Sequence, residues 1–236
     1  CLQATIEGVR RMRSSRSCIL SEERQSLVMS YSVKAIFYTL QGEGAQTGRP
    51  AVFCRFSHCN LWTGHERDRA RAICRFCDTD FVGTDGDGGG VFETAEQLAE
   101  EVASHWNNGR NEYVRPFVVC TGGEPLLQLD RPAIDALHNR DFEIAIETNG
   151  TILPPQGIDW ICMSPKSAAP FVLHEGNELK LVYPQDGLCP EQLTGLHFDH
   201  YFLQPMDGPE LAKNTQLALK YVLEHPQWRL SQQIHK

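Results

Sequence analysis

Three cysteines between positions 59 and 77 are the residues whose type and spacing most directly suggest chemistry. Two residues separate Cys74 from Cys77, and fourteen separate Cys59 from Cys74. Clustered thiolates are soft ligands that select zinc or an iron-sulfur centre. A structural zinc ion usually takes four ligands, so this interpretation needs His65, or less readily His58, as the fourth. A redox Cys-x-x-Cys pair would leave Cys59 unexplained. Three thiolates on a four-iron cluster would leave one iron open to another ligand.

Four further groups of polar residues come directly after apolar segments that have the composition of buried strands. They are Thr121 to Pro125, Glu147 to Gly150, Ser164 to Lys166 and Gln204 to Asp207. Any one of them could be an ordinary turn after a strand. Four such groups, with glycine, carboxylate, amide and lysine side chains, favour a binding site at the strand ends.

The hydrophobic pattern indicates which elements must position these residues. Short apolar segments alternate with amphipathic segments, which predicts βα units and a mostly parallel sheet, curved or closed. Right-handed crossovers bring the C-terminal end of every strand to one rim, where barrel enzymes hold their active sites. We expect strands at 33–39, 51–56, 117–121, 143–148, 160–164, 178–183, 200–204 and 228–232, and helices at 94–106, 125–139 and 210–224.

The composition is that of a folded, acidic protein. The hydrophobic fraction of 41% is enough for a core, and the formal charge of -8 argues against non-specific binding to nucleic acid. No segment approaches the roughly 20 apolar residues of a membrane span, and no signal peptide is evident, so we expect a cytoplasmic protein. Nine cysteines, several of them inside apolar segments, argue against a disulfide framework. We expect a disordered N-terminal extension over 1–28 and a single domain over 29–236.

The cysteines together with Gly122-Gly123-Glu124-Pro125 resemble the radical S-adenosylmethionine (SAM) superfamily. Most of its members have three and then two residues between the cysteines, whereas this chain has fourteen and then two. With that departure the chain resembles the 7-carboxy-7-deazaguanine synthase family, which carries such an inserted loop. The resemblance runs from about Tyr31 to the end and includes the stretches 37–44, 59–62, 74–80, 164–166 and 204–207.

This resemblance implies a lyase of the α/β class with a partial, modified (β/α) barrel. The implied reaction converts 6-carboxy-5,6,7,8-tetrahydropterin to 7-carboxy-7-deazaguanine with loss of ammonia, a radical ring contraction in queuosine and 7-deazapurine biosynthesis that serves tRNA modification. The implied cofactors are a 4Fe-4S cluster, SAM and Mg2+. The implied partners are the pterin substrate, an electron donor of the flavodoxin or ferredoxin type and a second copy in a homodimer, with no nucleic acid or membrane bound directly.

Carried over position by position, the resemblance assigns three groups of site residues. Cys59, Cys74 and Cys77 would hold the cluster, and Thr79 would supply an oxygen to magnesium. SAM would contact Phe76, Asp78, Gly123, Glu124, Ser164, Pro165, Lys166, Gln204, Pro205, Met206 and Asp207. The pterin would contact Leu40, Gln41, Gly42, Glu43, Arg55, Thr121 and His235.

Two other functions stay open at this point. A zinc-binding module without catalysis would account for the cysteines. A radical SAM activase of another enzyme would share the cluster but not the pterin-contact stretch 39–44. Members of the resembled family continue a few residues past the His-Lys pair found here as His235-Lys236. We therefore expect that a tail closing over the substrate is missing from this sequence.

Overall fold

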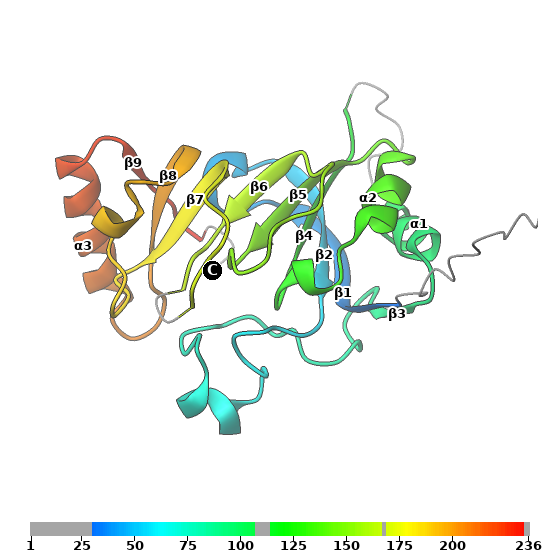
Figure 1. The fold of residues 1–236 in the computed structure, drawn as a ribbon, viewed down its shortest axis with the longest axis horizontal. Helices are drawn as coiled ribbons and strands as arrows, with labels where there is room; N and C mark the ends of the chain where they lie inside the picture. Colours follow the sequence, from blue (N-terminus) through cyan, green and yellow to red (C-terminus); the bar gives the residue numbers. More distant parts are fainter. Residues whose placement is uncertain (1–29, 107–113, 167–168, 234–236) are drawn as a thin grey trace, which may run out of the picture.

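The computed structural model describes residues 30–106, 114–166 and 169–233. The expected N-terminal extension, 1–28, and His235 lie outside these ranges. The described residues form one nine-stranded sheet in the order β3-β1-β2-β4-β5-β6-β7-β8-β9 (Figure 1). The strands are β1 (Tyr31–Leu40), β2 (Pro50–Phe56), β3 (Gly90–Phe92), β4 (Phe117–Gly122), β5 (Glu143–Thr148), β6 (Trp160–Met163), β7 (Glu175–Tyr183), β8 (His197–Pro205) and β9 (Trp228–Leu230).

The sheet is mostly parallel and open. Strand β1 runs antiparallel to β2 and β3, and every other neighbouring pair is parallel. The edge strands β3 and β9 do not pair with each other. This confirms the α/β class and the partial form of the expected barrel. The antiparallel start has a local cause, because residues 41–49 are fewer than the dozen or so that a crossover between parallel neighbours needs.

Three helices cover one side of the sheet. Helix α1 (Ala95–His105) and helix α2 (Arg131–His138) pack together near β1, β2 and β5, and helix α3 (Leu211–Glu224) packs on β8 and β9 (Figure 1). Helix α1 begins as expected, with the Thr94 hydroxyl accepting a hydrogen bond from the backbone N–H of Gln97. The expected continuous helix over 125–139 is wrong. A short 3-10 turn (Pro125–Leu127) comes first, and Asp130 then caps a separate helix by accepting from the N–H of Ala133.

Because side chains alternate along each strand, one face of the sheet packs into the core and the other face is left for polar side chains. In β7, Leu179 and Leu181 are fully buried in a core cluster that includes Ala218 of α3. Side chains of successive strand residues point to opposite faces. Lys180 therefore projects from the face that the helices do not cover, and the same alternation places Glu147 of β5 on that face.

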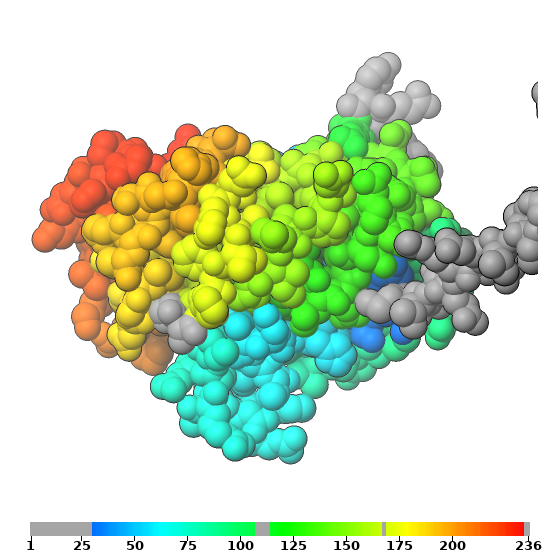
Figure 2. Space-filling model, in the orientation of Figure 1, coloured from blue at the N-terminus to red at the C-terminus, as the bar shows by residue number. Residues whose placement is uncertain are grey.

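The segment between β2 and β3 projects from the body of the sheet. It carries the three cysteines of interest and one short 3-10 helix, Glu66–Arg71. Figure 2 shows this segment, in cyan, as a separate protrusion against one side of the molecule. Among the described residues, no helix combines the length and apolar character needed to cross a bilayer.

Candidate active site

A cavity of about 510 Å³ opens where the parallel strands end and the projecting segment meets the sheet. Nineteen of the residues predicted to bind cluster, cofactor, magnesium or substrate line this one cavity. They are Leu40, Gln41, Gly42, Glu43, Arg55, Cys59, Cys74, Phe76, Cys77, Asp78, Thr79, Thr121, Gly123, Ser164, Lys166, Gln204, Pro205, Met206 and Asp207. Four strand ends and the cysteine segment therefore converge as the parallel topology predicts.

The three cysteines lie on the wall formed by the projecting segment. Cys74 is buried with Leu61 and Ala169, and Cys59 and Cys77 pack half-buried against this cluster. Burial raises the pKa of the Cys59 thiol. A hydrogen bond from the Cys74 thiol lowers the pKa of Cys77 to about 6, and raises that of Cys74. The backbone N–H of Leu61 also donates to the Cys59 sulfur, at 3.4 Å.

The arrangement suits an iron-sulfur cluster better than a single ion. Within the described ranges, no three His, Cys, Asp or Glu side chains converge closely enough to hold one metal ion. The structural zinc site considered from the sequence therefore lacks a geometric basis here. A cubane cluster takes its thiolates on different iron atoms, and backbone N–H donors to sulfur are typical of such sites. Three thiols on one cavity wall match that requirement.

Gly122 and Gly123 bring the cysteine segment against the end of β4. The N–H of Gly123 donates to the carbonyl of Phe56 at 3.1 Å, and the N–H of Glu124 donates to that of His58 at 2.9 Å. A Cβ at Gly123 would lie 1.9 Å from the His58 carbonyl oxygen. No side chain fits there, so the two glycines set the position of Cys59 relative to the sheet.

Glu124, which the resemblance assigns to SAM, has its carboxylate engaged inside the protein beside the cavity. It is 0% exposed and does not belong to the cavity lining. Its carboxylate accepts from the backbone N–H groups of Leu126 and Asn149 and from the hydroxyl of Thr148, at 2.8 to 3.1 Å. Burial raises the pKa of this carboxyl. Glu124 thus joins the end of β4 to the end of β5 from inside the protein.

Two other predicted contacts do not reach the described cavity lining. Pro165 does not belong to it, and the carbonyl of Pro165 accepts from the side-chain amide of Gln185 at 3.2 Å. His235 lies outside the described residues. Gln233, however, lines the cavity and donates to Glu43 at 2.8 Å, so the chain after β9 does reach the site.

Ser164 and Lys166 form a small cationic unit beside the cysteine segment. The Lys166 ammonium donates to the carbonyl and the hydroxyl oxygen of Ser164, each at 2.8 Å, and lies 5.7 Å from the ring centre of Phe76. Burial lowers the pKa of Lys166. This unit puts a positive charge and a hydroxyl beside the cysteine wall, where a carboxylate-bearing cofactor could be held.

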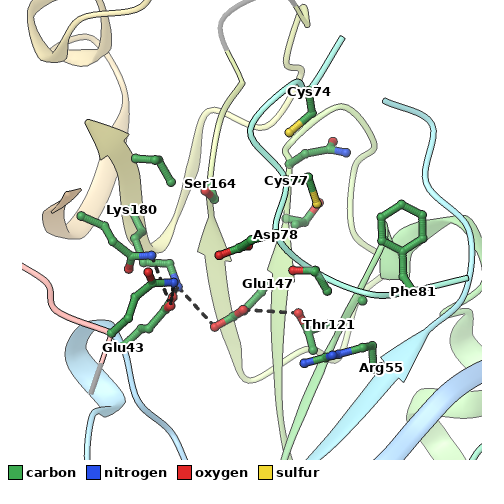
Figure 3. Close-up of a pocket in the computed structure, with 18 of the residues that line it drawn as sticks. Glu43, Arg55, Cys74, Cys77, Asp78, Phe81, Thr121, Glu147, Ser164 and Lys180 are labelled. Carbon is green, nitrogen blue, oxygen red and sulfur yellow. Dashed lines mark hydrogen bonds and ion pairs between the residues drawn. The ribbon is translucent and has the colours of Figure 1, made fainter. Parts of the chain in front are cut away.

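The sequence predictions missed a buried ion network on the floor of the cavity. Lys180 Nζ lies 2.5 Å from Glu43 Oε2 and 3.3 Å from Glu147 Oε1 (Figure 3). Burial alone lowers the pKa of Lys180, but the attraction of Glu147 and Glu43 outweighs it and holds the pKa well above its ordinary value. Gln41 and Thr121 donate to Glu147 at 3.2 and 3.3 Å. The available signal was a charged residue at an inward position within each of two apolar strands.

Arg55 supplies a cation with unused hydrogen-bonding capacity. It comes from β2, and its guanidinium carbon lies 5.5 Å from the ring centre of Phe37. Its Nη1 reaches the carbonyl of Asp80 only at 3.4 Å, and its buried Nε finds no hydrogen-bond partner among the residues that the structure describes. Figure 3 shows Arg55 beside Thr121 and Glu147, across the cavity from Cys74. An anion with paired oxygens would satisfy this fork.

Known proteins with similar sequences and structures identify the family. No family model matches the chain. It is 62% identical over 208 residues to the 7-carboxy-7-deazaguanine synthase of Caulobacter vibrioides, a match that covers 88% of this chain and 98% of that protein. The enzyme of the same name from Bordetella pertussis gives the same identity and coverage. The crystal structure of QueE from Escherichia coli superposes with a TM-score of 0.61 at 26% identity, over 88% of this chain and 95% of the other. Since relatives at this identity match over nearly their whole length, the chain belongs to the 7-carboxy-7-deazaguanine synthase family.

Proposed function

We propose that this chain is a radical SAM lyase that converts 6-carboxy-5,6,7,8-tetrahydropterin to 7-carboxy-7-deazaguanine with loss of ammonia, in queuosine and 7-deazapurine biosynthesis. The observation that carries the proposal is the composition of the cavity at the strand ends. This cavity joins three thiols, a cationic Ser164-Lys166 unit and the polar floor around Glu43 in one space of about 510 Å³. A zinc-binding module or an activase of another protein would not need the polar residues on that floor.

The cysteine side of the cavity would hold the cluster and SAM. Cys59, Cys74 and Cys77 offer three thiolates, which leaves one iron of a four-iron cluster open to the cofactor. A cluster with SAM bound supplies a one-electron reductive cleavage that starts radical chemistry on the substrate. Lys166 and Ser164 would hold the carboxylate end of the cofactor, next to Phe76. The stretch Gln204 to Asp207 lines the remaining wall.

The floor and the Arg55 side of the cavity would hold the pterin. The unsatisfied Arg55 fork suits the substrate carboxylate. Glu43, held by Lys180, Gln204 and Gln233, offers carboxylate oxygens to the N–H donors of a pterin edge. Gln41 and Thr121 donate hydrogen bonds to Glu147, the second carboxylate that pairs with Lys180. These side chains orient the ring between the cation that binds its carboxylate and the thiols opposite.

Magnesium would bind between these two sides through Thr79. The Thr79 side chain lines the cavity next to Asp78, two residues after Cys77. A single hydroxyl oxygen is a sparse protein contribution. It suits Mg2+ because this ion retains waters and takes further ligands from its substrate. The ion would bind the substrate carboxylate together with Arg55.

We also propose a homodimer and a one-electron donor of the flavodoxin or ferredoxin type. Support for access by such a donor comes from the outward position of the cysteine segment (Figure 2).

Anaerobic purification and product analysis test the proposal. The chain should bind iron and sulfide, and with SAM, Mg2+, reductant and the carboxylated pterin it should form 7-carboxy-7-deazaguanine and ammonia. Cys74→Ala should lose the cluster and the product, whereas Cys189→Ala, at an exposed cysteine outside the cavity, should keep both. A colourless protein that takes up zinc but no iron would overturn the proposal.

A further inference from the structure

We propose that Arg69, in the fourteen-residue insertion between Cys59 and Cys74, is a positioning residue that holds the Cys74–Cys77 turn in its cluster-binding geometry and contributes positive charge to the cluster site. This inference rests on the proposed function. It goes beyond the proposed function because it assigns a structural role to the insertion.

The guanidinium of Arg69 binds the turn that carries two cluster ligands. Its Nη1 donates to the carbonyl oxygen of Arg75 at 2.9 Å and to that of Cys77 at 3.0 Å. One cation thus joins two carbonyls on either side of Phe76, which itself lines the cavity. Hydrogen bonds to a charged donor are about twice as strong as neutral ones, so this contact restrains the turn more than a typical loop contact does.

The other contacts of Arg69 anchor it to the start of the same segment. The guanidinium carbon lies 4.1 Å from the ring centre of Trp62, which is buried and packs edge-on against Phe81. Its Nε pairs with the carboxylate of Glu66, at 2.7 Å for the nearer oxygen. The side chain is 28% exposed, whereas those of its neighbours Arg67 and Arg71 are 80% and 86% exposed. Of the arginines in this 3-10 helix, Arg69 is therefore the one whose side chain packs into the segment.

The N–H groups of Ile73 and Cys74 close the base of the insertion by donating to the carbonyl of Leu61 at 3.0 and 3.2 Å, so Arg69 acts on the stretch between these residues. The 3-10 helix of the insertion, Glu66–Arg71, contains no buried residue. A short loop between cluster cysteines is restrained by its own backbone, but a fourteen-residue excursion has more conformations to lose on ordering. A cross-link from Trp62 through Arg69 to Cys77 shortens the free part of that excursion. Reduction adds negative charge to a cluster, so the Arg69 guanidinium should also raise the reduction potential, by less than an unpaired cation would because Glu66 pairs with it.

The experiment compares iron binding and potential in full-length variants after anaerobic reconstitution. Arg69→Met keeps an unbranched stem over Trp62 and removes all donors. Arg69→Lys keeps the charge but cannot donate as a planar fork. Arg71→Ala is the matched control, because Arg71 lies in the same 3-10 helix, is 86% exposed and pairs with Asp68 at 3.4 Å. The readouts are iron per chain, the rate of iron loss to a chelator, and the midpoint potential followed by electron paramagnetic resonance.

We expect Arg69→Met to lose iron to the chelator about tenfold faster than Arg71→Ala, in line with the loss of an outer-shell partner of a metal site. The midpoint potential of Arg69→Met should be lower than that of Arg71→Ala. Arg69→Lys should bring the potential back close to the value of the unmodified chain, but it should bring back less of the iron retention. If Arg69→Met matches Arg71→Ala in both readouts, the inference is wrong although the proposed function stands. If Arg69→Met does not fold, the comparison of Arg69→Lys with Arg71→Ala decides by the same readouts. If the unmodified chain binds no iron, the proposed function itself fails.

Discussion

The ammonium nitrogen of Lys180 lies 2.5 Å from a carboxylate oxygen of Glu43, and the two side chains come from positions 137 residues apart in the chain. Lys180 also pairs with Glu147 at 3.3 Å, so one buried cation serves two carboxylates at the floor of the cavity. Two acidic side chains could not stay side by side in a buried site without such a partner. The lysine therefore makes the polar floor possible.

Replacing this cation should damage both stability and substrate binding. Lys180→Met leaves two partly buried carboxylates uncompensated, and we expect a loss of about 3 kcal/mol in the free energy of unfolding. We also expect a raised KM for the pterin. Lys180→Met combined with Glu147→Gln should recover part of the stability, because one negative charge is removed with the positive one.

The control for Lys180 is its neighbour on the opposite face of β7. Leu181→Ala empties part of the core and should cost a comparable 2 to 5 kcal/mol, roughly the usual range for such a change. It should leave KM unchanged because Leu181 does not line the cavity. Denaturant unfolding and steady-state kinetics separate the two effects, and an unaltered KM in Lys180→Met would contradict a role in the site.

Arg55 should control recognition of the substrate carboxylate. Arg55→Gln removes a charged donor, for which we expect an increase in KM of about tenfold to a hundredfold. Reductive cleavage of SAM without the pterin should be little changed, because Arg55 lies across the cavity from the cysteines. Arg49→Gln is a useful comparison, since Arg49 pairs with Glu143 and does not line the cavity. Equal KM values in the two variants would argue against the assignment.

Glu124 should make the stability of the chain depend on pH. Burial raises the pKa of its carboxyl above the ordinary value of 4.5. A group with a raised folded-state pKa contributes stability that is full below the unfolded-state pKa and is lost as pH rises through the folded-state pKa. Glu124→Gln cannot titrate. The unfolding free energy of the unmodified chain minus that of Glu124→Gln should therefore fall as pH rises above about 4.5.

Urea unfolding of the cluster-free chain at a series of pH values measures this difference. Glu143→Gln is a suitable comparison because Glu143 lies on β5 in a partly exposed pair with Arg49. A difference for Glu124→Gln that is constant across the series would show that the carboxyl keeps the same proton affinity in both states.

Thr79 should set the magnesium requirement. Thr79→Ala removes the proposed protein oxygen, so the Mg2+ concentration for half-maximal activity should rise, while Thr79→Ser should stay near the unmodified chain. Thr194→Ala serves as a control at a threonine outside the cavity. Titration of activity with Mg2+ at saturating SAM tests this, and superimposable curves for Thr79→Ala and Thr194→Ala would remove Thr79 from the ion site.

Much of the architecture could be predicted because its causes are local. The apolar strands, the cap at Thr94 and the turn residues after each strand are short-range patterns, and parallel topology then forces the strand ends together. The prediction of one continuous helix over 125–139 was wrong for a local reason as well. The capping capacity of Asp130 competes with helix continuation, and the periodic apolar pattern conceals it.

The sequence by itself determined the cysteine spacing, the glycines at the end of β4 and the family resemblance, because these depend on residue identity along the chain. Only the tertiary structure decided which charges meet. In the folded chain the Glu124 carboxylate is buried at the end of β5, and Lys180 pairs with Glu43 and Glu147. Arg69 donates a hydrogen bond to the carbonyl of Cys77. Such contacts depend on strand register and loop path. These are set by the packing of the whole molecule, and no local pattern encodes them.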